Sequence, residues 1–284
     1  MTNYYSKIKQ TNKYTRSFNY TGNKHRVLPI ILKLMPSNIN KFYDLMCGSG
    51  AVGLNVAAKE IVFNDLDKNS IDLLKHCYEA PLQNILDYMQ ANMPTSKEEF
   101  LKLKQNKNHI LDNYLLKKVS LLNEGSTFRI DRDWVFNRHS RNKYTNLINL
   151  LKGKNIIFSN SSFELVEIEQ NNNNYVYFDP PYITTAKSYK YNFAVKDSVK
   201  LANLFQDLHS KNIKFGLSCS LFTTKGYDLP IIQAIQNNKF IVHAIDLINN
   251  LVFKIDDIEA FFSEWLKKGK VDKYEMFVTN YQAL

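Results

Sequence analysis

The sequence predicts an α/β protein with a doubly wound sheet, interrupted by an inserted and mostly helical lobe. A short strand runs into a Gly-rich turn, and a second strand ends at an acidic residue. A Lys-rich helical stretch then separates these elements from a later set of strands. With 284 residues, of which 44% are hydrophobic, the chain is long and apolar enough to bury a large core.

The first elements predict the start of the sheet. Residues 41–45 (KFYDL) indicate a strand that runs into the turn at 47–50, and a helix is expected to begin near Ala51. Residues 61–64 indicate a second buried strand, and the apolar pattern of residues 68–78 is typical of a helix. Strand, turn, helix, strand, helix is the order in which doubly wound folds begin.

The pattern changes between residues 81 and 154. Polar, Lys-rich helices are followed by a basic and aromatic stretch at 124–144 that we expect to be irregular. We therefore predict an inserted lobe at 81–154, within a domain formed by 1–80 and 155–284. Strands are expected to resume at 154–158, 175–178, 213–218, 241–245 and 276–279.

The charge favours a polyanionic partner. The chain has 37 Lys and Arg against 27 Asp and Glu, a net charge of +10. No acidic residue occurs before Asp44, and a second basic block runs from Arg129 to Lys154. These blocks indicate phosphate contacts, although a solvated basic face would have the same composition.

Cysteine and histidine usage gives no sign of a metal site. Cys47, Cys77 and Cys219 are too few and too far apart for a disulfide scaffold or a zinc site, and the six His lack ligand spacing. No apolar run reaches 18 residues, and the N-terminus does not read as a signal peptide. We therefore expect a cytoplasmic protein that does not contact a membrane.

The Gly-rich turn is a candidate cofactor site. Gly48 and Gly50 let the backbone turn tightly after Asp44 and approach a ligand. The third Gly of the dinucleotide fingerprint is absent, which disfavours a dinucleotide. Asp65 lies at the end of the next predicted strand, where its carboxylate can accept hydrogen bonds from both hydroxyls of a ribose. The alternatives are an ordinary turn and, for Asp65, a helix N-cap.

A second motif follows the strand at 175–178. Asp179, Pro180, Pro181 and Tyr182 come at its carboxyl end, where open α/β sheets bind ligands. The two prolines make the turn rigid. The Asp179 carboxylate and the Pro180 carbonyl could accept both N–H bonds of an adenine amine and stabilise the positive charge that develops on nitrogen. Tyr182 offers a flat face for an extruded base. The alternative is a Pro-rich turn with a capping Asp.

These residues resemble the Dam-like (D12 class) family of DNA adenine N6-methyltransferases, whose members carry a D-P-P-Y motif. The resemblance covers nearly the whole chain. It implies a Rossmann-like methyltransferase sheet with a target-recognition lobe at 81–154. It also implies methyl transfer from S-adenosyl-L-methionine to adenine N6 in double-stranded DNA by base flipping.

The resemblance also assigns cofactor residues. The segment at 18–24 is similar to the family's N-terminal cofactor segment, which makes Tyr20, Gly22 and Lys24 expected contacts at the methionine end of the cofactor. Asp65 is then the ribose acid, and Asp179 is both a catalytic and a cofactor residue. The segment at 154–164 is similar to the one beneath the cofactor adenine, although its Phe163 could equally belong to the core.

The basic stretch between the two motifs is the candidate DNA-reading region. Arg and Asn can contact guanine and adenine edges, and an aromatic side chain can fill the gap left by a flipped base. The run Phe136-Asn137-Arg138-His139 departs from the F-N-V-P-like run of GATC-specific relatives, which argues against GATC as the target. The alternative is a loop that touches only phosphates. The candidate residues are Arg129, Arg132, Asn137, Arg138, Arg141 and Lys143.

Two other functions remain open at this stage, and the sequence argues against a third. An RNA adenine or guanine amino methyltransferase can use the same turn, although such enzymes usually have a shorter spacer between the motifs. A cytosine-C5 enzyme needs a Cys nucleophile in a Pro-Cys context, and this chain has no Pro-Cys dipeptide. A catalytically dead nucleic-acid-binding regulator could share the fold. A cognate restriction endonuclease is a possible partner, and a monomer is the default expectation.

Overall fold

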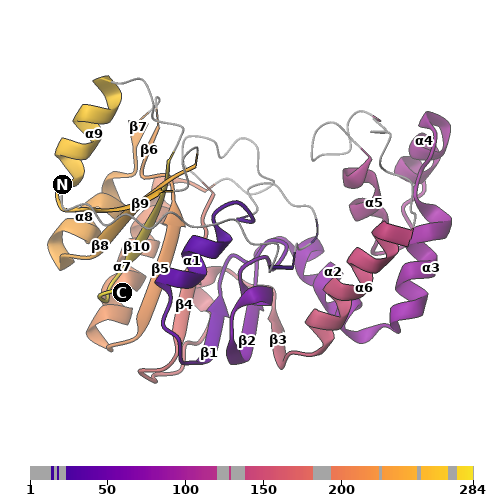
Figure 1. The fold of residues 1–284 in the computed structure, drawn as a ribbon, viewed down its shortest axis with the longest axis horizontal. Helices are drawn as coiled ribbons and strands as arrows, with labels where there is room; N and C mark the ends of the chain where they lie inside the picture. The colour runs from indigo at the N-terminus through magenta and orange to yellow at the C-terminus, as the bar shows by residue number, and fades with distance from the viewer. Residues whose placement is uncertain are drawn as a thin grey trace.

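The computed structural model describes residues 14–15, 18, 24–119, 128, 138–181, 193–223, 226–247, 251–267 and 274–283. Within these residues an eight-stranded mixed sheet runs through the middle of the molecule, in the order β3-β2-β1-β4-β5-β10-β8-β9 (Figure 1). The sheet confirms the predicted α/β class.

Five neighbouring strands are parallel, and they form the part of the sheet that carries the motifs. In sheet order they are β3 (Ile156–Ser159), β2 (Ala58–Asn64), β1 (Ile39–Asp44), β4 (Tyr175–Phe178) and β5 (Lys214–Cys219). The chain moves outward from β1 to β3 on one side and from β4 to β5 on the other. The boundary between β1 and β4 is therefore the topological switch point, the usual ligand site of such sheets.

The rest of the sheet is mixed. β10 (Tyr274–Thr279) runs antiparallel to both of its neighbours, β5 and β8 (Ile241–Asp246). β9 (Leu251–Ile255) pairs antiparallel with β8 at the edge. A separate two-stranded hairpin joins β6 (Phe222–Thr223) and β7 (Gly226–Tyr227).

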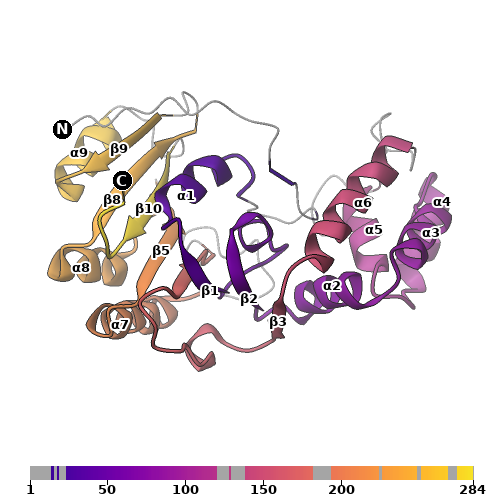
Figure 2. The same ribbon diagram turned by 60° about the horizontal axis from the view of Figure 1, so that its bottom comes forward.

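Helices cover both faces of the sheet, so each face is packed against a core. On one face lie α1 (Leu28–Leu34) and α2 (Lys68–Glu79), and on the other α7 (Val195–Ser210) and α8 (Leu229–Asn238). The strand β4 shows the consequence, because all four of its residues are buried. Tyr175 and Tyr177 join the first core, and Val176 and Phe178 join the second. A further helix, α9 (Ile258–Lys267), lies near β9 (Figure 2).

Four helices stand beyond β3 at one end of the molecule (Figures 1 and 2). Their buried side chains, among them Leu86, Phe100 and Leu115, continue the core that lies under α2. Residues 81–154 therefore contain a group of helices outside the sheet, and their assignment to a separate lobe remains our prediction. The helices are α3 (Leu82–Asn92), α4 (Lys97–Gln105), α5 (Asp112–Lys118) and α6 (Arg138–Lys152).

Several sequence expectations were wrong. Only a 3-10 turn, η1 (Gly53–Asn55), follows the Gly turn in place of the helix expected near Ala51, because β2 already begins at Ala58 and leaves no room. The stretch expected to be irregular up to residue 144 is helical from Arg138. The buried apolar stripe of α6 begins at Tyr144, so the basic residues at the start of this helix gave no sign of it in the sequence. The strands β6, β7 and β9 were not predicted.

Candidate active site

Three carboxylates meet at the carboxyl edge of the parallel strands. Asp44 ends β1, Asp65 follows β2, and Asp179 follows β4. Because these strands are neighbours in the sheet, the motifs that are far apart in the sequence share one site. Each of the three has a raised pKa, mainly because burial disfavours its charge, and Asp44 and Asp179 are raised further by the nearby charge of Asp65.

The turn after β1 needs its glycines. Gly48 and Gly50 have φ of 52° and 72°, in the left-handed region that other residues rarely adopt. A Cβ on Gly50 would lie 3.2 Å from Cζ of Phe63. The Gly48 N–H donates to Oδ2 of Asp65 at 2.7 Å, so the turn and the acid form one unit.

Asp65 is fixed by three neighbours. Its Oδ1 accepts from the Asp67 N–H at 2.8 Å, and the Asn160 side chain donates to the Asp65 carbonyl at 2.7 Å. The N-cap of α2 is Asp67, which accepts from the Asn69 N–H, so the helix-cap alternative for Asp65 is wrong. The Asp65 oxygens each accept one hydrogen bond and retain lone pairs for further donors.

Asn64 was missed by the sequence reasoning, although it holds the edge together. It is fully buried, and its amide donates to the carbonyls of Leu45 and Ser161 at 2.9 and 3.0 Å. The backbone carbonyl of Asn64 accepts from the Cys47 N–H at 2.9 Å. The ends of β1, β2 and β3 are thereby tied to the Gly turn. A polar residue within a predicted buried strand was the signal available in the sequence.

Asp44 carries a buried oxygen without a partner among the described residues. Its Oδ2 accepts from the Gly53 N–H at 3.2 Å, whereas Oδ1 has no hydrogen bond there. The residue is only 1% exposed, and burial raises its pKa well above the usual range. An unsatisfied buried acceptor is costly, and a bound ligand that donates to it would remove the cost.

Asp179 lies against a lysine from the N-terminal part of the chain. The Lys24 ammonium is 2.6 Å from Oδ1 of Asp179 and 3.4 Å from Oε1 of Glu275. The Asp179 side chain remains 20% exposed, and none of the described residues donates a hydrogen bond to its Oδ2. Burial raises its pKa to about 7, with Lys24 opposing the shift and Glu275 adding to it. Glu275 had no role in the sequence interpretation.

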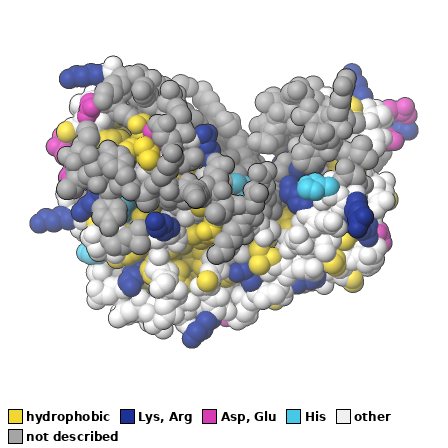
Figure 3. All heavy atoms as spheres, viewed as in Figure 1, with side chains coloured by type: hydrophobic (Ala, Val, Ile, Leu, Met, Phe, Trp, Pro, Cys, Tyr) yellow, Lys and Arg dark blue, Asp and Glu magenta, His cyan; other side chains and the backbone are white. Residues whose placement is uncertain are grey.

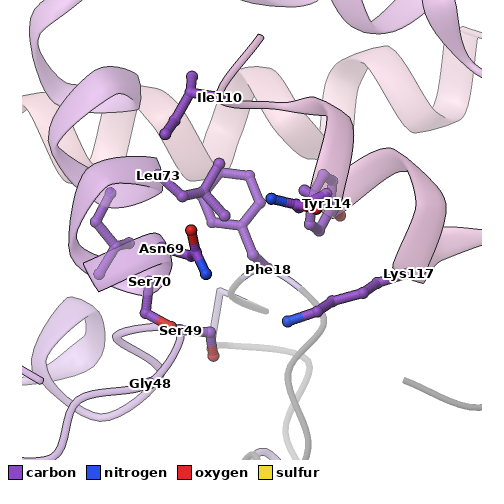
Figure 4. Close-up of a pocket in the computed structure, with 11 residues that line it drawn as sticks. Phe18, Gly48, Ser49, Asn69, Ser70, Leu73, Ile110, Tyr114 and Lys117 are labelled. Atoms are coloured by element: carbon purple, nitrogen blue, oxygen red, sulfur yellow. The ribbon is translucent and has the colours of Figure 1, made fainter. Parts of the chain in front are cut away.

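Phe18 connects the N-terminal segment to the helices beside the sheet. Its ring meets Tyr114 edge-on at a centroid distance of 5.0 Å and stacks with Tyr144 at 6.5 Å. Figure 4 shows Phe18 between Leu73 and Tyr114, with Ser49 and Lys117 at the same pocket. The pocket joins the Gly turn to α2 and α5. The remaining lining residues are Gly48, Asn69, Ser70, Leu74, Ile110 and Asn113.

The remaining cofactor and catalytic candidates are placed as follows. Phe163 lies in the 3-10 turn η2 (Phe163–Leu165), is 8% exposed and packs in the core between the sheet and α7. Pro180 is buried and Pro181 partly buried. Tyr20, Gly22 and Tyr182 lie outside the described residues.

The DNA-reading candidates are only partly described. Arg129, Arg132 and Asn137 lie outside the described residues. Arg138 is exposed at the start of α6, and Lys143 is half-buried. Arg141 donates to Gln90 at 2.9 Å and to Asp87 at 3.2 Å on α3, which ties it to a neighbouring helix.

Three further properties concern the described part of the chain: its surface charge, its metal-ligand residues and its hydropathy. On the face shown in Figure 3, Lys and Arg side chains are spread over both parts of the molecule, and Asp and Glu show mainly near its outer edges. In the described ranges no three His, Cys, Asp or Glu are grouped so as to hold a metal ion. Nor does any helix in those ranges combine the length and hydropathy needed to cross a membrane.

Known proteins share this sequence pattern over most of the chain. The modification methylase StsI of Streptococcus sanguinis is 28% identical over 240 residues, which cover 75% of this chain and 36% of that protein. The type II methyltransferase M.FokI of Planomicrobium okeanokoites is 28% identical over 248 residues, 77% of this chain and 38% of that protein. The chain thus spans little more than a third of the length of these two relatives.

A third relative matches from end to end. The type II methyltransferase M1.LlaDCHI of Lactococcus lactis subsp. cremoris is 25% identical over 293 residues, 92% of this chain and 94% of that protein. Among solved structures, the rRNA methyltransferase aviRa from Streptomyces viridochromogenes has 12% identity and a TM-score of 0.32 over 68% of this chain and 70% of that chain, which is too low to bear on the substrate. The model of one family, D12 class N6 adenine-specific DNA methyltransferase, matches residues 20–263. The chain belongs to the D12 class of N6 adenine-specific DNA methyltransferases.

Proposed function

We propose that this chain transfers a methyl group from S-adenosyl-L-methionine to the N6 atom of an adenine flipped out of double-stranded DNA, at a specific sequence. The observation that carries the proposal is the state of Asp179. One carboxylate oxygen is held by Lys24, and the other has no donor among the described residues at the ligand-binding edge of the sheet. Family membership makes an adenine amine the fitting donor.

The residues at the switch point fit the cofactor. Asp65 would accept from the ribose hydroxyls, and the Gly48–Gly50 turn lets the methionine part approach the backbone. The unpartnered Oδ1 of Asp44 offers an acceptor beside that turn. The side chain of Leu66 is 48% exposed next to Asp65 and provides apolar surface for an adenine ring. When bound, the cofactor supplies an electrophilic methyl group.

Asp179 would act on the amine. The adenine N6 lone pair is delocalised into the ring, and acceptors for both N–H bonds localise it on nitrogen. Oδ2 of Asp179 and the Pro180 carbonyl are the proposed acceptors, and they also stabilise the positive charge that develops on nitrogen. This role needs an ionised Asp179, and Lys24 favours that form. Tyr182 would stack on the flipped base.

DNA binding would involve the helices beside the sheet. Residues 81–154 form the proposed target-recognition lobe, and Arg138 is the described candidate that is most exposed to a duplex. Arg129, Arg132, Asn137, Arg141 and Lys143 complete the proposed DNA-binding set. Because the relatives are named modification or type II methyltransferases, a cognate restriction endonuclease is the proposed partner. Cellular DNA as the substrate implies the cytoplasm, and a monomer is proposed.

A methylome experiment tests this function. The gene is expressed in a host that lacks adenine methylation, and host DNA is sequenced by a long-read method that detects N6-methyladenine. We expect one methylated sequence motif with the intact chain and none with Asp179→Ala. The exposed Asp207 on α7, which pairs with Lys211 just after that helix, provides the control variant Asp207→Ala, for which we expect an unchanged methylome.

Purified protein then separates DNA from RNA. With radiolabelled S-adenosyl-L-methionine, the label should enter duplex DNA that contains the motif and should not enter ribosomal RNA. Label in RNA alone would favour the RNA amino methyltransferase. Cofactor binding without transfer to either nucleic acid would favour the inactive regulator.

A further inference from the structure

A fourth carboxylate, that of Glu275, lies at the active site without a part in the chemistry proposed above. Glu275 is 7% exposed, and its Oε1 accepts from the Ser218 hydroxyl at 2.7 Å. The same oxygen lies 3.4 Å from the Lys24 ammonium. Lys24 in turn contacts Asp179 at 2.6 Å. Ser218, Glu275, Lys24 and Asp179 therefore form a continuous chain of contacts that ends at Oδ1 of Asp179, on the same carboxylate as the proposed catalytic Oδ2.

The direction of β10 explains why Glu275 reaches the site. β10 runs antiparallel to β5, so its first residues lie at the carboxyl edge of the parallel strands. Glu275 is the second residue of β10, and its neighbour Met276 pairs with Cys219 at the end of β5. Figures 1 and 2 show β10 beside β5. The sheet thus brings a residue near the C-terminus to the residue that follows β4.

Glu275 is electrostatically unfavourable for Asp179. Its charge raises the pKa of Asp179 and so opposes the ionised form that should accept the amine. Its presence therefore calls for a compensating role. Lys24 supplies one, because the long lysine stem is flexible and the Glu275 acceptor restricts where its ammonium lies.

We propose that Glu275 is a positioning residue for methyl transfer: anchored by Ser218, it fixes the Lys24 ammonium against Oδ1 of Asp179 and leaves Oδ2 for the target amine. The inference rests on the function proposed above. Oδ1 of Asp179 then stays in the ion pair with Lys24. Oδ2 does not exchange places with it and stays available to the target amine. The alternative is that the Ser218–Glu275 hydrogen bond only ties β5 to β10.

The test is Glu275→Gln in the full chain. Gln retains the size and an oxygen that accepts from Ser218, and it removes the charge that holds the ammonium. We expect the pH-independent kcat to fall by about 10-fold to 100-fold, as misplacement of a reacting group does. Affinities for S-adenosyl-L-methionine and for motif DNA, measured by calorimetry and by fluorescence anisotropy, should stay within twofold.

The pH profile is the second readout. Removal of the Glu275 charge should move the acid limb of kcat/KM to lower pH by about 0.5 to 2 units, the range that Coulomb's law gives for two charges roughly 6 Å apart at effective dielectric constants of about 80 and about 20. Among the described residues, the groups that remain around Asp179 are Lys24, Asp65, Asp44, Tyr177 and Cys219. A merely structural hydrogen bond would lower Tm and leave the kcat plateau unchanged, which would overturn the proposal. A limb that moves while the plateau stays unchanged would report only the lost charge and would also overturn the positioning role.

Three further variants make the result decisive. Ser218→Ala releases the anchor without a change of charge, so kcat should fall while the acid limb stays near its wild-type pH. Glu275→Asp keeps the charge on a shorter side chain and should recover part of the kcat lost in Glu275→Gln. If Glu275→Gln does not fold, equal kcat in Ser218→Ala, Glu275→Asp and wild type would overturn the proposal. Glu259→Gln, on the exposed surface of α9, is the matched control.

The outcomes also separate this inference from the proposed function. If the wild-type chain methylates no DNA, the proposed function fails. If the wild type is active and Glu275→Gln keeps its kcat plateau, only the positioning role of Glu275 fails. Fluorescence of 2-aminopurine at the target position reports base flipping independently of chemistry, and Glu275→Gln should leave that signal unchanged.

Discussion

The Lys24 ammonium lies 2.6 Å from Oδ1 of Asp179, although the two residues are far apart in the sequence. Lys24 precedes α1, and Asp179 follows β4. Lys24 is 6% exposed, so the pair is largely shielded from water, where an ammonium acts strongly on the ionisation of a carboxyl group. Several measurable consequences depend on this contact.

Replacement of Lys24 by Met should shift the pH dependence of methyl transfer upward. Lys24 lowers the pKa of Asp179, which burial raises to about 7. Without the ammonium this pKa rises further, so Asp179 stays protonated to higher pH and the acid limb of kcat/KM follows it. A pH series of kcat/KM measures the shift. A limb that stays in place or moves to lower pH would contradict the role given to Lys24, and Lys211→Met, just after α7, is the control.

Asp179→Ala should abolish most methyl transfer while the protein stays folded. The substitution removes an acceptor from the reacting amine, and the expected loss in kcat is on the order of 10²-fold or more. Lys24 retains Glu275 as a partner in the variant, which limits the structural cost. Single-turnover kinetics measure the loss, and circular dichroism checks the fold. Full activity of the purified variant would remove Asp179 from the mechanism.

Asp65 and Asp67 should respond differently to alanine substitution. Asp65→Ala is expected to weaken S-adenosyl-L-methionine binding by roughly 1 to 3 kcal/mol, the range for loss of a charged hydrogen-bond partner. Asp67→Ala removes the N-cap of α2 and should instead lower the free energy of unfolding by about 1 kcal/mol. Calorimetry and urea denaturation measure the two effects. Unchanged cofactor affinity in Asp65→Ala would assign the residue to the turn alone.

Gly216→Ala should destabilise the protein. A Cβ at this position in β5 would collide with the Tyr175 hydroxyl and lie 2.6 Å from Cζ of Phe277. Overpacking of this kind costs about 1 to 3 kcal/mol in the free energy of unfolding, which urea denaturation measures. Gly153→Ala is the control, since its Cβ would meet nothing closer than 3.3 Å. Equal stability of the two variants would mean that β4, β5 and β10 pack differently from the arrangement described.

Arg138 and Arg141 should differ in their effect on DNA. Arg138 is exposed, so Arg138→Ala should weaken DNA binding. A lost base contact costs roughly 1 to 3 kcal/mol at the cognate site and relaxes specificity, whereas a lost phosphate contact weakens all sequences and lowers the salt slope by about one. Arg141→Ala should weaken DNA binding less than Arg138→Ala, because Gln90 and Asp87 hold the Arg141 side chain, and loss of these two contacts should also lower Tm. Fluorescence anisotropy with cognate and mismatched duplexes distinguishes these outcomes. Unchanged DNA binding in Arg138→Ala would mean that other residues read the DNA.

The fold and the main motifs could be predicted because they depend on local patterns. The strand of residues 175–178 is a continuous apolar run, and Asp179 with its two prolines must follow it directly. The Gly turn and Asp65 could be predicted for the same reason, because each directly follows a predicted strand. The helix expected near Ala51 was wrong, because a glycine pattern does not say how soon the next strand begins.

What the sequence by itself determined, then, is the set of residues at the strand ends, since each is fixed by the strand before it. Only the tertiary structure decided which distant side chains join them. Glu275 lies at the site because β10 is antiparallel, and Lys24, which precedes α1, pairs there with both Asp179 and Glu275. Strand order and direction bring residues together across the whole chain, and no local pattern contains that information.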